Sequence, residues 1–169
     1  EDYGVTNLYR QFLRGAKLAN SKYVAVADDD TLYPKEHFEY RPPDNKFAYN
    51  MNRWHIFTWG RPLYFHKPRP GNGLIIATRK LIVEALTKRF EKMQELTGDF
   101  TKELGVKESM RNNDGSDFCE FYTRYPVVSF YHQQSIDPLN QSRRKKAWPV
   151  KVYELPKWGR ATKLRKHFK

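Results

Sequence analysis

The stretch YVAVADDDTLYP, residues 23–34, places three consecutive aspartates directly after a short apolar run. The run from Tyr23 to Ala27 is typical of a strand that is covered on both faces in a parallel sheet. Adjacent carboxylates repel each other, and each is costly to remove from water without a partner. A divalent cation would supply that partner, so we predict a metal site where the strand ends.

The segments around this stretch predict helices that alternate with strands. Apolar residues at spacings of three and four indicate a helix over residues 5–19, and Thr78 is suited to cap a second helix that ends near Gly98. The further expected elements are short helices over 34–40 and 116–124, one or two strands within 46–59, and strands over 74–77 and 127–131. Open α/β sheets bind ligands at the carboxyl ends of their strands, where the aspartates are expected to lie.

Positive charge is concentrated at one end of the chain, which carries a net charge of +12 over its 169 residues. Residues 143–169 contain eleven of the 31 Lys and Arg residues but only one of the 19 acidic residues, Glu154. We therefore expect a main domain over residues 1–142 and a basic extension over residues 143–169. A polyanionic partner would meet this extension first.

The partner of the basic extension stays open at the level of sequence. Trp158, Ala161, Leu164 and Phe168 fall near helical spacing with Lys and Arg between them, as in a basic helix on an anionic membrane surface. The same mixture of cations and aromatic rings suits nucleic acid. A third alternative is that the extension simply folds against the main domain.

Cysteine content and hydropathy limit the class of protein. The single cysteine, Cys119, excludes an internal disulfide and a cysteine-built zinc site, which fits a reducing compartment. The sequence contains no run of about 18 apolar residues. We expect a cytoplasmic protein, held peripherally at a membrane if its extension binds lipid.

Four segments together form an ordered pattern: SKYVAVADDDTLYP, PGNGLIIATRKLI, NNDGSDFCEFYTR and VVSFYHQQS. Over residues 3–135 this pattern resembles the GT-A-fold glycosyltransferases, in which a strand ending in Asp-x-Asp is followed by a glycine loop, a downstream Asp and a late His. The resemblance implies an α/β fold with a mixed, mainly parallel sheet flanked by helices. Residues 1–142 would be the C-terminal portion of such a catalytic domain, completed by a missing N-terminal segment or by a partner chain.

The resemblance also implies an activity, the transfer of a sugar from a nucleotide donor such as a UDP-sugar to an acceptor hydroxyl. The acceptor would be an envelope or lipid-linked glycan or a modified DNA base. A bound Mn²⁺ or Mg²⁺ would stabilise the leaving diphosphate as a Lewis acid. The implied metal ligands are Asp28, Asp30 and His132.

Other residues receive roles from the same resemblance. Asp117 would deprotonate the acceptor as the general base, with Asp114 as its rival. Besides Asp28, the implied donor-binding residues are Asp29, Gly71 and Gly73. Trp54 and Trp59 are candidates for stacking against the acceptor.

Two other functions fit parts of the sequence. A non-enzymatic nucleic-acid-binding domain would account for the basic charge and the many aromatic residues. Metal-dependent phosphoryl transfer or nuclease chemistry would account for the clustered aspartates. The simplest alternative for the three aspartates is a solvated turn whose carboxylates cap a helix.

Overall fold

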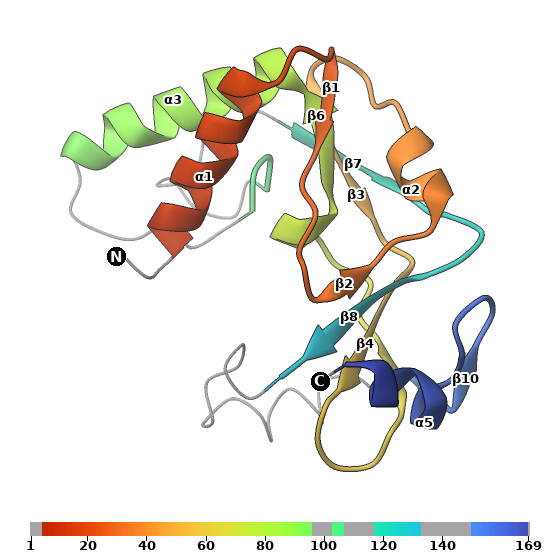
Figure 1. The fold of residues 1–169 in the computed structure, drawn as a ribbon. Helices are drawn as coiled ribbons and strands as arrows, with labels where there is room; N and C mark the ends of the chain where they lie inside the picture. Colours follow the sequence, from red (N-terminus) through yellow and green to blue (C-terminus); the bar gives the residue numbers. More distant parts are fainter. Residues whose placement is uncertain (1–4, 96–102, 107–116, 133–149, 169) are drawn as a thin grey trace. The chain divides into compact units, whose positions relative to one another are not determined.

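The computed structural model describes residues 5–95, 103–106, 117–132 and 150–168, which divide between two compact units (Figure 1). The first unit is built from three stretches of the chain, Glu1–Ala27, Tyr40–Tyr49 and Pro70–Glu120. The second unit is built from the other three, Asp28–Glu39, Asn50–Arg69 and Phe121–Lys169. The chain therefore crosses between the units several times, and the aspartates of residues 28–30 belong to the second.

The first unit combines a four-stranded sheet with two long helices. Its strands, in spatial order, are β1 (Tyr23–Ala25), β6 (Ile75–Thr78), β3 (Lys46–Asn50) and β7 (Asp117–Phe121). The helices α1 (Val5–Leu18) and α3 (Arg79–Glu95) pack against each other, and the short 3-10 helix η1 (Asn72–Leu74) precedes β6 (Figure 1). Tyr9 on α1 is fully buried, and its hydroxyl donates to Asn72 Oδ1 at 3.0 Å.

The second unit contains a five-stranded sheet. Its strands, in spatial order, are β2 (Thr31–Leu32), β8 (Val127–Tyr131), β4 (Arg53–Phe57), β5 (Tyr64–His66) and β9 (Lys151–Val152). The short helix α2 (Lys35–Glu39) follows β2. After β9 come the remaining elements, which are the hairpin of β10 (Glu154–Leu155) and β11 (Gly159–Arg160), the helix α5 (Ala161–Leu164) and the 3-10 helix η4 (Arg165–His167).

The prediction of a mainly parallel, GT-A-like sheet is wrong. β4 runs parallel to β8, but β1–β6, β3–β6, β2–β8, β4–β5 and β5–β9 are antiparallel pairs. Parallel neighbours need a long crossover connection, whereas the loop over residues 58–63 allows β4 and β5 only a hairpin. β1 is also shorter than predicted, lies at the edge of its sheet and is partly exposed rather than covered on both faces.

The helix predicted over residues 116–124 is wrong, and the C-terminal segment does not form the basic helix that was one of its open alternatives. Residues 117–121 form the strand β7 instead of a helix, in keeping with the strand preference of the aromatic residues Phe118 and Phe121. The C-terminal segment forms β10, β11 and two single-turn helices instead of one continuous amphipathic helix. Its apolar side chains pack on the core of the second unit, which is made by Ile56, Tyr64, Val128, Phe130, Leu155 and Ala161.

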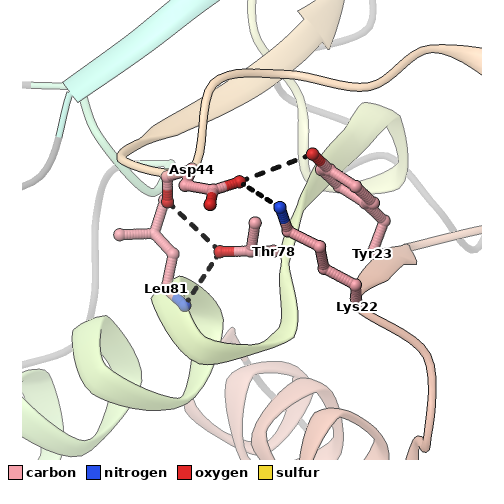
Figure 2. A network of polar contacts seen from close by, with 5 residues as sticks. All are labelled: Lys22, Tyr23, Asp44, Thr78 and Leu81. Atoms are coloured by element: carbon pink, nitrogen blue, oxygen red, sulfur yellow. Dashed lines mark hydrogen bonds and ion pairs between the residues drawn. The ribbon is translucent and has the colours of Figure 1, made fainter.

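Most local elements are confirmed. The long helices α1 and α3, the short helix α2, and the strands β3, β4, β6 and β8 lie where the sequence predicts them. The predicted cap of α3 is present, because Thr78 Oγ1 accepts a hydrogen bond from Leu81 N at 3.3 Å (Figure 2). Among the described residues, no helix is both long enough and apolar enough to cross a membrane.

A histidine lies in the interior of the second unit. His37 on α2 is fully buried beside the rings of Tyr33 and Phe121, at centroid distances of 4.9 and 5.7 Å. The Asn50 side-chain amide donates to His37 Nδ1 at 3.3 Å, which requires a neutral imidazole with Nδ1 unprotonated. Burial lowers the pKa of His37 to about 4.

This buried imidazole predicts a loss of stability in mild acid. As the pH falls below the usual pKa of about 6.5, His37 takes up a proton in the unfolded chain. In the folded chain His37 stays neutral down to about pH 4. The free energy of unfolding therefore falls as the pH drops, by about 2 kcal/mol from His37 alone between about pH 7 and pH 5. Urea unfolding at both pH values should show a His37→Gln variant losing less stability than the parent by roughly this amount. Equal losses in both proteins, or a His37 pKa near 6.5 by NMR, would contradict the assignment.

Candidate functional site

The acidic turn of residues 28–30 is attached to β8 by the strand that follows it. β2 pairs antiparallel with β8 so that Thr31 lies opposite Ser129, and the two side-chain oxygens are 2.9 Å apart. The carbonyl of Asp30 accepts a hydrogen bond from Phe130 N at 2.8 Å. Thr31 Oγ1 also donates to Asp30 Oδ1 at 3.0 Å. Both the backbone and the carboxylate of Asp30 are therefore held against β8.

This attachment brings together Asp30 and His132, which the sequence separates by about one hundred residues. His132 directly follows β8, and its Nε2 lies 3.8 Å from Asp30 Oδ2. The His132 side chain is 33% exposed and the Asp30 side chain is 22% exposed, so a ligand can reach both. At 3.8 Å the two groups are adjacent but too far apart for a direct hydrogen bond between them.

Asp28 is coupled to Asp30 by charge. Its side chain is half-buried, and its backbone N–H donates to the Tyr33 hydroxyl at 2.9 Å. Burial raises the pKa of Asp28, the negative charge of Asp30 raises it further, and the guanidinium of Arg53 opposes both effects. Asp28 therefore takes up a proton more readily than an ordinary aspartate.

The three predicted metal ligands do not form a closed metal cage. Within the part of the chain that the structure describes, no three His, Cys, Asp or Glu residues group closely enough to hold a metal ion. Asp30 and His132 are a pair of oxygen and nitrogen ligands. Mg²⁺ and similar ions are commonly held by one or two carboxylates, with substrate phosphates and water in the remaining positions. The pair fits a cation that arrives with a phosphate-bearing ligand, and it does not fit a structural metal.

The predicted general base and the predicted donor glycines belong to the first unit. Asp117 begins β7, where its Oδ2 lies 3.5 Å from Lys46 Nζ and its Oδ1 accepts a hydrogen bond from Phe118 N. Gly71 is buried and has extended backbone at φ −163°, and Gly73 lies in η1. Asp114 lies outside the described residues. Their catalytic and donor-binding roles stay predictions.

The two tryptophans predicted to contact an acceptor lie in the second unit and are packed against neighbours. Trp54 on β4 donates its indole N–H to Asn52 Oδ1 at 3.1 Å and lies over His66. Trp59 packs edge-on against Phe57 at 5.0 Å. Both rings are partly exposed, so an acceptor role for them stays a prediction.

Two residues beside the acidic turn were missed by the sequence analysis. His167 and Phe168, from the C-terminal segment, line the same pocket as Asp29 and Asp30. The sequence did show apolar residues at helical spacing in the C-terminal segment, ending at Phe168. Spacing alone does not predict which surface these apolar side chains pack against. In the structure they cover the core around Phe130, which directs the end of the chain to the acidic turn.

A larger cleft of about 510 Å³ lies in the first unit beside the start of α3. Figure 2 shows part of its wall, where Asp44 accepts from Tyr23 at 3.4 Å and pairs with Lys22 at 3.0 Å. Lys80 in the same wall pairs with Glu84 at 3.8 Å. Lys22 and Lys80 already have carboxylate partners, and Arg79 is a third cation in the lining of this cleft.

The coupling of Asp28 to Asp30 predicts a measurable pKa change. Replacing Asp30 by Asn removes a negative charge that raises the pKa of Asp28, so that pKa should fall toward its ordinary value. Carboxyl-detected NMR titration would measure it. Arg53→Gln should move the Asp28 pKa the opposite way, and an unchanged Asp28 pKa in both variants would contradict the described geometry.

Comparison with known proteins gives no match for this chain among family models, curated proteins or solved structures. The assignment of a function therefore depends on the geometry of the site itself.

Proposed function

We propose that the chain carries a divalent-cation-dependent site for glycosyl transfer from a nucleotide-diphosphate donor, centred on Asp30 and His132. The observation that supports the proposal is the approach of His132 Nε2 to Asp30 Oδ2, at 3.8 Å, from a distant part of the chain. A carboxylate and an imidazole on one partly exposed edge are suitable ligands for Mn²⁺. Asp28, with its raised pKa, stands beside them as a second carboxyl group.

Each residue of this site would have a separate role. Asp30 and His132 would hold a Mn²⁺ or Mg²⁺, and the bound ion would supply Lewis-acid stabilisation of the leaving diphosphate. Thr31 Oγ1 orients the Asp30 carboxylate and the Phe130 amide holds the Asp30 backbone carbonyl, which lowers the free energy spent on ordering that carboxylate when a ligand binds. Asp29, which is exposed, is available to the hydroxyls of a bound sugar.

For activation of the acceptor, we propose the same residues as in the sequence analysis. Asp117, or Asp114 in its place, is proposed as the general base that removes the acceptor proton. Asp117 Oδ2 lies 3.5 Å from Lys46 Nζ in the first unit. The donor is proposed to be a UDP-sugar.

Polyanion binding is a second candidate function, because the described C-terminal segment exposes many cations. The exposed basic residues on its surface include Lys151, Lys157, Arg160, Lys163 and Lys166. The apolar side chains that a membrane helix would need are packed on the core of the unit, so the exposed charge favours nucleic acid over a lipid surface.

The metal-dependent proposal predicts the behaviour of two variants. Isothermal titration with UDP-glucose should detect binding that requires Mn²⁺, and Asp30→Asn and His132→Ala should each weaken it at least about tenfold because each removes a metal ligand. Asp44→Asn is the matched control, since Asp44 is an exposed aspartate whose ion pair lies in the first unit.

The same titration separates the two candidate functions. Binding of single-stranded DNA that falls steeply with salt, survives EDTA and is unchanged in Asp30→Asn would favour the polyanion function. If Mn²⁺ has no effect on binding of any UDP-sugar, or if Asp44→Asn is as harmful as Asp30→Asn, the glycosyl-transfer proposal is wrong.

A further inference from the structure

A small pocket of about 200 Å³ opens beside the acidic turn in the second unit. Its lining includes Asp29 and Asp30 from the turn and His167 and Phe168 from the C-terminal segment. Pockets that bind drug-sized molecules usually measure about 300–1,000 Å³. This one is therefore suited to a single ring or a group of similar size.

The floor of the pocket is apolar and partly aromatic. Phe168 stacks on Phe130 with a centroid distance of 4.6 Å and an interplanar angle of 9°. The ring of His132 lies 6.0 Å from the same phenylalanine at 23°. Leu32 and Leu164 complete the apolar lining. Phe168 thus belongs both to the pocket and to the immediate surroundings of the Asp30–His132 pair.

The polar groups of the pocket restrict the ligands that fit. Without a bound cation, the carboxylates of Asp29 and Asp30 repel phosphate and other anions, and a purely apolar ligand would strip water from them without replacing its hydrogen bonds. Carboxylates accept strong hydrogen bonds from hydroxyl groups. The matching ligand has several hydroxyls along one edge and a flat C–H face that covers the phenylalanine.

We propose that this pocket binds one ring of a sugar, with the C–H face of the ring on Phe168 and its hydroxyls donating to Asp29 and Asp30. The C-terminal segment then forms one wall of the binding site. The inference deepens the proposed function and rests on it, because the ring would be the donor's or the acceptor's sugar. Both sources share this chemistry, and the experiment distinguishes them.

Imidazole signals in NMR provide a direct test. The chain has five histidines. His132 and His167 lie at or beside the pocket, whereas His37 and His55 are fully buried and serve as internal references. Methyl glucoside or methyl galactoside, at concentrations on the order of 10 mM, should shift the first pair saturably and leave the references unchanged.

Nucleotide ligands identify the source of the ring. If the pocket holds the donor sugar, UDP-glucose with Mn²⁺ should shift the His167 signal where UDP with Mn²⁺ does not. If it holds the acceptor sugar, the free glycoside should shift that signal with UDP and Mn²⁺ already bound. Either result supports the proposal.

Variants of the C-terminal wall complete the experiment. Phe168→Ala and His167→Ala should each weaken glycoside binding several-fold, Phe168→Tyr should restore it, and Lys166→Ala is the control because its exposed side chain does not line the pocket. Thermal unfolding verifies that each variant folds. If Phe168→Ala does not fold, glycoside binding by His167→Ala tests the proposal in its place.

Two results would overturn the inference. One is that no sugar gives a saturable shift, and the other is that benzylamine, an ammonium on an aromatic ring, binds more tightly than every glycoside. Mn²⁺-dependent UDP binding that survives such a result would leave the proposed function standing. Sugar binding at the pocket without any Mn²⁺-dependent nucleotide binding would instead show that the proposed function is wrong. The inference that the pocket binds a sugar ring would then still stand.

Discussion

The pairing of β2 with β8 is the constraint on which the candidate site depends. β2 is only two residues long, yet it sets Thr31 opposite Ser129 and attaches the acidic turn to β8, the strand that His132 directly follows. A one-residue slip in this register would move every side chain of β2 to the opposite face. The hydrogen bond from Phe130 N to the Asp30 carbonyl and the contact between the Thr31 and Ser129 hydroxyls oppose that slip. The Asp30–His132 pair is therefore a consequence of strand register.

The structure also shows how the chain tolerates three adjacent acids. Asp29 is exposed to water, Asp30 faces an imidazole, and Asp28 lies near the guanidinium of Arg53. These separate environments reduce the repulsion that made a cation look necessary from sequence alone. A bound ion is then a functional hypothesis, supported by the partly exposed Asp30–His132 pair.

Local structure could be predicted from the sequence, whereas strand direction could not. The periodicity that identifies α1 and α3, and the Thr78 cap, are properties of short segments. Strand direction is decided by which segments pair across the chain, and the three residues of β1 carry no signal that distinguishes a parallel from an antiparallel neighbour. The aromatic segment around Phe118 shows the same limit, since a helix was predicted over residues 116–124 despite the strand propensity of its aromatic residues.

The site itself was predictable in part. The order of the Asp triplet and His132 along the sequence resembles that of a known family, and this resemblance implied that the residues lie close together. The structure brings Asp30 and His132 together through the antiparallel pairing of β2 with β8. His167 and Phe168 were missed because the C-terminal segment was treated as a separate basic extension. Its apolar residues were recognised, but a spacing pattern cannot tell a membrane surface from the protein's own core.

The central claim is that Asp30 and His132 together bind a divalent cation, and paramagnetic relaxation by Mn²⁺ tests it most directly. In the presence of UDP, substoichiometric Mn²⁺ should broaden the signals of His132 and the backbone amides of residues 28–31 first, and Asp30→Asn should abolish this selective broadening. Broadening that is centred on other carboxylates, such as Asp44 or Glu84, or that is unchanged by Asp30→Asn, would contradict the claim.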